Sequence, residues 1–599
     1  MNKFGKVFLA SLLAFIVGTF VVFAFFFMIF AGFAASFSTK PIAVAERSVL
    51  KIDLGDSIVD SPENKVNTLD LSSYKISGSN TILEVLRAVE YAAEDPYIKG
   101  IYINFTGSGG MTSANVEELR SALLKFRESG KFVVSYNETY STLGYYLCSV
   151  SDKVFVNPEG AFDWRGLTTG VMFYKGLLDK LDAEVEVFRH GSFKAGVEPF
   201  ITDRMSPENR LQTSIMVNSY WNVMLQDIQA SRSITAAELN NFAENLTIKD
   251  VETAQRMGLV DGLLYQDQVN GYLYALCHDE DPAGRMDDRK SPKVNSVSLS
   301  DYIAANTMSY NRSSRNRIAL IYADGDIIDG ESVRGSIGSI TMSEKISNAR
   351  KDDAIKAVVL RINSPGGSAL ASEIMWRELK MLQEEKPLIV SMGGYAASGG
   401  YYIASPADVI LADRSTITGS IGVYGLKLNI DRTLRNKLGI TMDFVKTNPS
   451  ADMMMPFRSL NRSERDFVQY QIEDTYATFV NHVAEGRNMT FDEVDAIAQG
   501  RVWLGADANN NGLVDGFGGL DDAIRLAADR ASITSDYRVV EITDAPDSFA
   551  AIMQMVTGVR AKSRLESELG EAFRDYNMLM NTLSEEGIQA RLPYFVDFQ

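Results

Sequence analysis

Residues 355–361 read IKAVVLR, and residues 98–104, which lie 257 positions earlier, read IKGIYIN. Each stretch is a short, mostly apolar run, the pattern of a buried strand. A glycine pair follows each run at the same spacing, Gly109-Gly110 in the first case and Gly366-Gly367 in the second. A strand that recurs together with its glycine pair indicates that the chain contains a duplicated unit.

Other matches extend this repeat in the same order along the chain. They are VS at 134 and 390, GYY at 144 and 400, and GLVDG at 258 and 512. Their offsets of 256, 256 and 254 residues are nearly constant, which chance similarity would not produce. We therefore predict two related halves, at about residues 45–305 and 317–550, joined by a linker at 306–316.

Strands and helices are expected to alternate within the second half. The predicted elements are a strand at 357–362, a turn at 363–367, a helix at 368–384, a strand at 387–391 and a helix starting within 395–404. Ile374, Leu379 and Leu382 are expected on the buried face of the first helix. This order predicts an α/β fold with mostly parallel sheets. Residues 551–599 are rich in helix formers and predict a helical tail.

The N-terminal segment predicts a membrane anchor. Residues 7–39 contain no charged side chain, whereas a spanning helix needs about 20 apolar residues and the core of a cleavable signal only about 7–15. Lys3 and Lys6 precede this run and favour a cytoplasmic N-terminus. Residues 1–39 are therefore expected to anchor the chain in a membrane and to hold the rest of it on the side away from the cytoplasm.

The overall composition excludes several classes of function. The 599 residues include 59 basic and 77 acidic side chains, a formal charge of −18, which argues against a dedicated nucleic-acid binder. Two cysteines and three histidines provide neither a disulfide framework nor metal-ligand spacing, so no metal or cofactor is predicted. Residues 507–512 begin like a calcium loop, but its twelfth position is Gly518 instead of glutamate.

Three segments contain residue types suited to acyl transfer. Ser398 lies among glycines and alanines directly after a predicted strand, where a helix start would supply free backbone N–H groups. Gly366 and Gly367 could supply unshielded N–H groups for an oxyanion hole. Lys194 lies in the loop sequence FKAGVEPF. Taken one at a time, each segment also fits a tight turn or a solvated lysine.

Together, these segments resemble the signal peptide peptidase A family in its long, membrane-bound bacterial form, also called protease IV. The motifs that carry the resemblance are NSPGG at 363–367, ASGGY at 397–401, TGSIG at 418–422, and FK at 193–194 followed by VEPF at 197–200. The resemblance implies tandem domains of the Clp protease and crotonase type and a serine–lysine dyad. Ser398 would be the nucleophile, Lys194 the general base and Ser420 the residue that orients the lysine. It also implies a homotetramer.

The repeat agrees with a site shared between the halves. At an offset of 256 residues, Ser398 corresponds to Thr142, and Lys194 corresponds to Ser450, so neither half contains all the parts. Lys446, which corresponds to His190, is interpreted as a surface lysine. A lysine of ordinary pKa, about 10.4, is almost entirely protonated at pH 7, but burial in an apolar cleft can lower that pKa by up to about 3–5 units.

The resulting hypothesis is a membrane-anchored serine endopeptidase that degrades cleaved signal peptides and other apolar peptides. Two alternatives stay open. A crotonase-type acyl-CoA enzyme would share the fold and the glycine turn, although it would lack CoA outside the cytoplasm. A catalytically inactive scaffold would be the alternative without enzymatic activity, and Ser398, Lys194 and Ser420 argue against it.

Overall fold

The computed structural model describes residues 44–53, 58–65, 67–70, 75–104, 110–286, 293–306, 314–543 and 588–592, and five positions between 11 and 19. The predicted anchor at 7–39 lies outside the described residues apart from those five positions, and most of the linker at 306–316 also lies outside them. Within the described ranges, no helix combines the length and apolar character needed to cross a bilayer.

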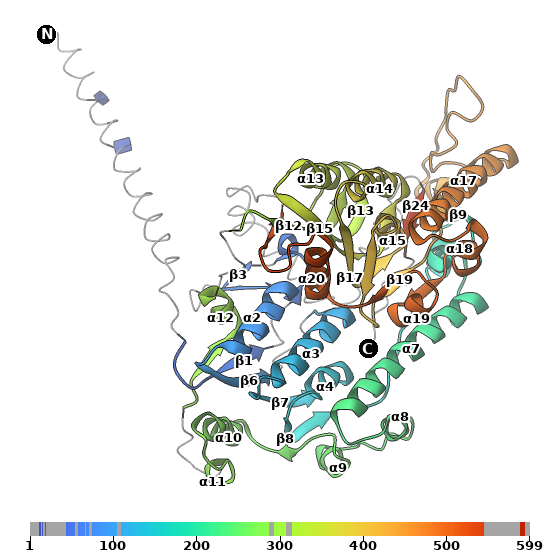
Figure 1. Cartoon of the computed structure of the whole chain (residues 1–599). Coiled ribbons are helices and arrows are strands. Elements are labelled where there is room, and N and C mark those ends of the chain that lie inside the picture. The colour runs from blue at the N-terminus through green and yellow to red at the C-terminus, as the bar shows by residue number, and fades with distance from the viewer. Residues whose placement is uncertain are drawn as a thin grey trace.

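The first half forms a six-stranded parallel sheet (Figure 1). In spatial order its strands are β11 (Ser296–Ser298), β1 (Ser48–Asp53), β6 (Ile98–Asn104), β7 (Phe132–Tyr140), β8 (Lys153–Phe162) and β10 (Gly262–Leu263). Its main helices are α2 (Ile82–Glu94), α3 (Ser113–Arg127), α4 (Thr142–Cys148), α7 (Pro207–Ser231), α9 (Val251–Arg256), α10 (Gln266–His278) and α12 (Leu299–Ala305). The strands are apolar and largely buried, as expected for a parallel sheet covered by helices.

The second half repeats this order strand for strand. Its parallel strands are β23 (Arg538–Ile542), β12 (Arg317–Asp324), β15 (Ile355–Ser364), β17 (Leu388–Ala397), β18 (Val409–Ala412) and β22 (Gly516–Phe517). Two strands that extend the sheet beyond β17 are β19 (Ile417–Gly419) and β21 (Val502–Leu504). Its main helices are α13 (Ser339–Lys351), α14 (Ala369–Gln383), α15 (Gly399–Ala404), α17 (Arg462–Arg487), α18 (Phe491–Ile497), α19 (Gly505–Asn510) and α20 (Leu520–Arg530).

The GLVDG repeat has the same role in both halves. Asp261 accepts a hydrogen bond from the backbone N–H of Val154 in β8, and Asp515 accepts one from the N–H of Ile410 in β18, each at 2.8 Å. Both carboxylates therefore tie a loop to the same strand of their own sheet. The equal strand order and these equal contacts confirm the predicted duplication and α/β fold.

Two predicted details of the second half differ from the structure. The strand predicted at 387–391 continues through Ala397, so residues 395–397 extend β17 and the helix begins only at Gly399. Ile374 is 41% exposed, whereas Leu379 and Leu382 are buried as predicted. The buried face of α14 follows the spacing 372, 375, 379, 382, and Ile374 lies outside that face because it is one residue out of phase.

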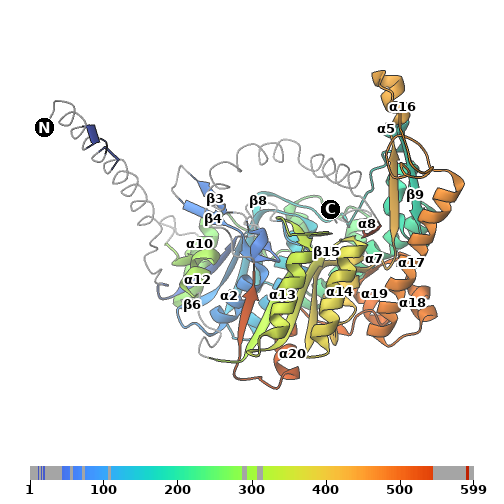
Figure 2. The ribbon, with the colours of Figure 1, turned by 90° about the horizontal axis from the view of Figure 1, so that it is seen from above.

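A third sheet joins segments that are distant in the sequence. In spatial order its strands are β14 (Ser336–Gly338), β13 (Asp326–Ile328), β16 (Gly366–Ser368), β24 (Gln589–Arg591), β20 (Tyr424–Asn429) and β9 (Glu184–Arg189). Strand β9 leaves the first half and pairs antiparallel with β20 of the second half over six residues. Figure 2 shows β9 and α17 at the end of the molecule away from α10 and α12. The predicted helical tail differs at 589–591, which form strand β24.

A buried ion-pair cluster holds the two halves together. The Arg361 guanidinium in β15 lies 2.6 Å from the Asp60 carboxylate and 2.7 Å from the Glu118 carboxylate, both of which belong to the first half. All three side chains are at most 2% exposed. Removing one member of such a cluster leaves a buried charge without compensation, so arrangements of the halves that separate these three side chains are disfavoured.

Candidate active site

Ser398 occupies a strained turn between β17 and α15. Its φ of 55° and ψ of −114° are rarely adopted by a residue with a Cβ. Its N–H donates to the Gly419 carbonyl at 2.8 Å, which fixes the turn against β19. The next two residues must be glycine, because a Cβ on Gly399 would lie 2.7 Å from Ser372 Oγ and one on Gly400 would lie 2.7 Å from the Ser364 carbonyl. The small residues around Ser398 thus allow the sharp turn.

Strand β9 carries Lys194 from the first half to this turn. The loop after β9 places Lys194 directly before a 3-10 helix (Ala195–Val197), and the lysine side chain is fully buried. Its Nζ lies 2.7 Å from Ser398 Oγ and 3.1 Å from both the carbonyl oxygen and the Oγ of Ser420. The structure therefore brings together Ser398, Lys194 and Ser420, which lie on three separate segments of the sequence.

These three contacts match the hydrogen-bonding capacity of a neutral amine. A neutral Nζ has one lone pair and two N–H groups, so it can accept from the Ser398 hydroxyl while donating to the two Ser420 oxygens. Desolvation by burial lowers the pKa of Lys194 well below its ordinary value. Burial thus favours the neutral form of the lysine, the form that can take a proton from the serine.

Two glycines that the sequence analysis did not select shape the lysine site. A Cβ on Gly500 would lie 2.5 Å from the Lys194 Cβ, and one on Gly422 would lie 3.3 Å from the Lys194 Cδ. Gly500 also has a φ of +77°. Gly422 is the last glycine of the TGSIG motif, which is a sequence signal for its role, but no local signal marks Gly500. Both positions must stay small so that the lysine stem can pass.

The glycine pair that follows β15 lies beside the same turn. Gly366 has a φ of +102°, and a Cβ on it would lie 2.7 Å from the Gly399 nitrogen. The N–H of Gly366 donates to Ser364 Oγ at 3.1 Å. Gly367 lies against β13, where a Cβ would come within 1.9 Å of the Ile327 carbonyl. Gly366 thus permits close approach to the start of α15, and Gly367 follows it within strand β16.

The other ionisable residues considered from the sequence lie in different contacts. His190 stacks on Tyr476 and contacts Glu473 through its Nδ1. Lys446 is partly exposed and bonds to Asp452 and to the Pro449 carbonyl, each at 3.0 Å. Over the described ranges, no group of three or more His, Cys, Asp or Glu side chains could hold a metal ion.

Comparisons with known proteins agree with this geometry. The family model described as "Peptidase family S49" matches residues 125–276 and 380–534. "Protease 4" from Salmonella typhi is 36% identical over 534 residues, which cover 86% of this chain and 83% of that protein. "Serine protease SPPA, chloroplastic" from Arabidopsis thaliana is 32% identical, covering 84% and 72%.

Two further matches are shorter. "Putative signal peptide peptidase SppA" from Enterococcus faecium is 35% identical over 243 residues, which cover 40% of this chain and 70% of that protein. A solved structure of a mutant ClpP1 from Listeria monocytogenes covers 35% of this chain and 94% of its own, with 14% identity. Its TM-score of 0.23 is too low to support a conclusion about the fold.

Proposed function

Because the chain belongs to peptidase family S49, we propose that it is a serine endopeptidase with Ser398 as nucleophile and Lys194 as general base. The observation that carries this proposal is the 2.7 Å contact between Lys194 Nζ and Ser398 Oγ inside a fully buried site. A serine hydroxyl is a weak nucleophile until a base removes its proton, and a neutral lysine can do so.

The proposed reaction is amide hydrolysis through an acyl-enzyme. Ser398 Oγ attacks the substrate carbonyl carbon while its proton passes to Lys194 Nζ, which then donates that proton to the departing amine. Ser420 keeps the amine aimed at Ser398 through its two oxygens. Water, deprotonated by the same lysine, then attacks the acyl-enzyme and releases the second product with regeneration of Ser398.

The tetrahedral intermediate carries a negative charge on the former carbonyl oxygen, and N–H groups must donate hydrogen bonds to this oxygen. Gly366 and Gly367 were expected from the sequence as these donors. Because the Gly366 N–H already donates to Ser364 Oγ at 3.1 Å, we assign the role to the N–H groups of Gly367 and Gly399. Gly399 begins α15, whose first N–H groups have no partner within the helix. Preorganised donors of this kind are typically worth about 10²–10³ in kcat each.

The proposed substrates are cleaved signal peptides and other apolar peptides, cut at the outer face of the cytoplasmic membrane. The uncharged run at 7–39 supports an anchor, and the Enterococcus faecium relative is named a putative signal peptide peptidase. We also propose that the chain assembles as a homotetramer. A peptide held close to the bilayer would offer apolar side chains and no globular fold to resist entry.

Covalent labelling by a fluorophosphonate, together with hydrolysis of an apolar peptide, tests the dyad in the detergent-solubilised full chain. We expect Ser398→Ala to abolish both, and Lys194→Ala to lower hydrolysis by at least about 10³-fold. Lys446→Ala is the matched control and should retain wild-type rates, because this lysine contacts Asp452 instead of the site. Near-normal hydrolysis by Lys194→Ala would refute the dyad.

A further inference from the structure

A buried glutamine joins the loop of Lys194 to the second half. Gln212 lies in α7 of the first half, and its side chain is buried. Its Nε2 donates to the Phe193 carbonyl, and its Oε1 accepts from the Val502 N–H, each at 3.1 Å. Phe193 belongs to the first half, whereas Val502 is the first residue of β21 in the second half. One side-chain amide therefore binds backbone groups of both halves.

Both of these backbone segments lead to the proposed dyad. The carbonyl that Gln212 binds belongs to the peptide unit that joins Phe193 to Lys194. Strand β21 pairs antiparallel with β19, and the Gly419 carbonyl at the end of β19 accepts the Ser398 N–H at 2.8 Å. The amide of Gln212 thus connects the backbone beside the base to the strand pair that fixes the turn of the nucleophile.

Two further buried side chains fix the direction of this amide. Gln212 Nε2 also donates to Asn209 Oδ1 at 3.3 Å, and Asn209 Nδ2 donates to Glu198 Oε2 at 2.9 Å. A carboxylate accepts hydrogen bonds but donates none, so Glu198 attracts the NH2 group of Asn209 and leaves its oxygen facing Gln212. Glu198 belongs to the VEPF motif at 197–200, so this motif helps to orient Gln212.

The place of the Lys194 backbone determines where its amine lies. On the other side of this residue, Arg189 Nη1 donates to the Lys194 carbonyl at 3.1 Å, so the backbone is held from both directions. Because the lysine stem passes close to Gly500, a shift of the backbone would also move Nζ, which lies 2.7 Å from Ser398 Oγ. A displacement of about 1 Å can lower the rate of a reaction by about 10²-fold.

We infer that Gln212 is a positioning residue of the proposed dyad, because its amide sets the distance between the Lys194 backbone and the strands that hold Ser398. The inference rests on the proposed function, since it concerns the same base and the same nucleophile. The hydrogen bonds of Gln212 go to two backbone groups and to Asn209, so it acts on the reaction through the place of Lys194. Loss of the amide should therefore lower kcat and leave KM unchanged.

Hydrolysis of an apolar peptide by the full chain tests this role. Gln212→Met keeps the length of the side chain but removes its hydrogen bonds, so kcat should fall at least about tenfold while KM changes by less than about twofold. Gln226→Met, at an exposed position of the same helix, is the matched control and should keep wild-type values. A wild-type kcat in Gln212→Met would overturn the inference. If Gln212→Met does not fold, Gln212→Glu provides the test.

Gln212→Glu gives a readout that depends on pH. A protonated carboxyl has one O–H donor and an acceptor oxygen, so it can replace both backbone contacts of the amide, whereas a carboxylate has no donor for the Phe193 carbonyl. Burial can raise the pKa of a glutamic acid to about 8–9. The kcat of Gln212→Glu relative to wild type should thus be highest near pH 5 and fall at least about fivefold by pH 10. A ratio that is independent of pH would overturn the inference, and Gln226→Glu should show such a constant ratio.

A double substitution tests whether Gln212 acts through the lysine. Fluorophosphonate labelling needs only one reaction per molecule, so the slow residual rate of a chain with Lys194→Ala can be followed. Adding Gln212→Met to this chain should not lower that rate further, because no lysine amine is left to be positioned. A further tenfold loss would reveal an effect that is independent of the base, and would overturn the inference.

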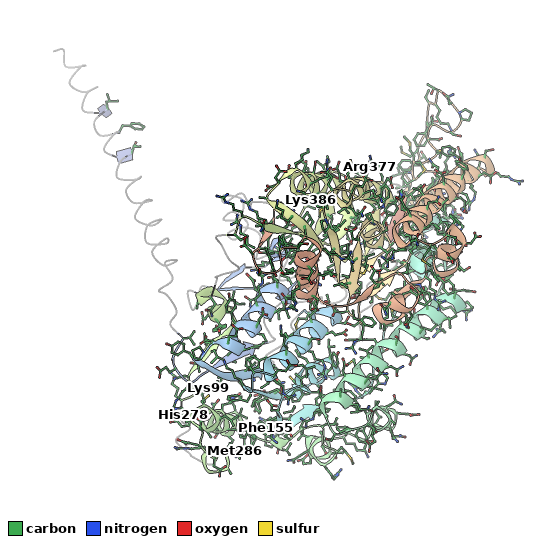
Figure 3. All side chains as sticks on the ribbon, viewed as in Figure 1. Lys99, Phe155, His278, Met286, Arg377 and Lys386 are labelled. Atoms are coloured by element: carbon green, nitrogen blue, oxygen red, sulfur yellow. The ribbon has the colours of Figure 1, made fainter. Side chains whose placement is uncertain are left out.

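Lys386 provides a control for the pH series. Desolvation also lowers the pKa of this lysine, whose Nζ donates to the Asp352 carbonyl at 2.7 Å, and Figure 3 labels its side chain beside α13 and α14. Lys386→Arg removes this titrating amine and should leave the midpoint of the pH profile unchanged. A shifted midpoint would refute Lys194 as the base and, with it, the proposed function.

The two proposals fail separately. Normal hydrolysis by Lys194→Ala would refute the proposed function. If Lys194→Ala loses hydrolysis but the folded Gln212→Met chain keeps a wild-type kcat, the proposed function stands and the positioning role of Gln212 is refuted. Each result is therefore assigned to one proposal.

Discussion

The buried amine of Lys194 determines how the reaction should depend on pH. Its pKa is lowered well below the ordinary value because burial disfavours the charged form. Only the neutral amine accepts the Ser398 proton, so kcat/KM should rise with pH along one limb whose midpoint lies below about 10.4. A pH series of initial rates on an apolar peptide measures this midpoint. A profile that is flat between about pH 5 and 10 would contradict a lysine base.

The backbone of Ser398 provides a second prediction at the scale of single residues. Its φ of 55° and ψ of −114° suit glycine, so serine is retained there at a conformational cost of about 1–3 kcal/mol. Ser398→Gly and Ser398→Ala should both be inactive. The free energy of unfolding of the glycine variant should exceed that of the alanine variant by about 1–2 kcal/mol, so the glycine variant should unfold at a higher urea concentration. Urea unfolding of the two variants side by side measures this difference. Equal stabilities would mean that the turn is not strained.

Sequence reasoning reached only some of the residues at the site. Ser398, Lys194 and Ser420 were predicted because their motifs resemble those of a family. The local sequence pattern alone would not have paired Lys194 with Ser398, which lies 204 positions away. Gly500 could not be predicted, because its need for a small side chain arises only when Lys194 arrives from another segment. The donor assignment within the glycine pair likewise could not be made from the sequence GG, because it depends on the hydrogen bond from the Gly366 N–H to Ser364 Oγ.

Strand β9 is the element that determines where Lys194 lies. Its six-residue ladder with β20 ends at Arg189, five positions before the lysine. Phe188 occupies a hydrogen-bonding position of this ladder, opposite Gly425. Phe188→Pro would remove its N–H from the ladder, so we expect a loss of at least about tenfold in kcat/KM. Phe188→Leu keeps the N–H and an apolar side chain and should stay near wild type. Circular dichroism of both variants reports whether the large parallel sheets persist, and full activity of a folded proline variant would contradict this role.

The large sheets and the small third sheet differ in how far the sequence predicts them. Long apolar runs and a repeat with constant offsets were enough to predict the two parallel sheets. The short strands β9 and β24 were not predicted, because each pairs antiparallel with a segment more than 200 residues away. Their hydrogen-bond partners come from distant parts of the sequence. A composition rich in helix formers also does not prevent three residues of the tail from forming a strand against such partners.

At the scale of the whole molecule, Asp324 links the stability of the junction to pH. It accepts hydrogen bonds from Asn64 of the first half (2.7 Å) and Asn363 of the second half (2.9 Å). Burial, followed by the nearby charge of Asp60, raises the pKa of Asp324 to about 6. The folded chain therefore binds more protons than the unfolded chain between about pH 4 and 6. The contribution of this group is present at low pH and is lost as the pH rises through about 6.

Asp324→Asn should remove this dependence. The stability difference between wild type and the variant should fall by up to about 3 kcal/mol from pH 4 to pH 7, which is the shift of about two pKa units converted to energy. Urea unfolding at both pH values measures it. Asp353→Asn, at an exposed position, is the control and should show no such change. A constant difference for Asp324→Asn would show that this carboxyl titrates normally.

The division of the proposed dyad between the halves affects when the two residues become available during synthesis on the ribosome. Lys194 and Ser398 are separated by 204 residues, which take roughly 10–40 s to synthesise at about 5–20 residues per second. A nascent chain can thus fold its first half while it still lacks a nucleophile. On the proposed function, hydrolytic activity arises only after the second half has folded against the first.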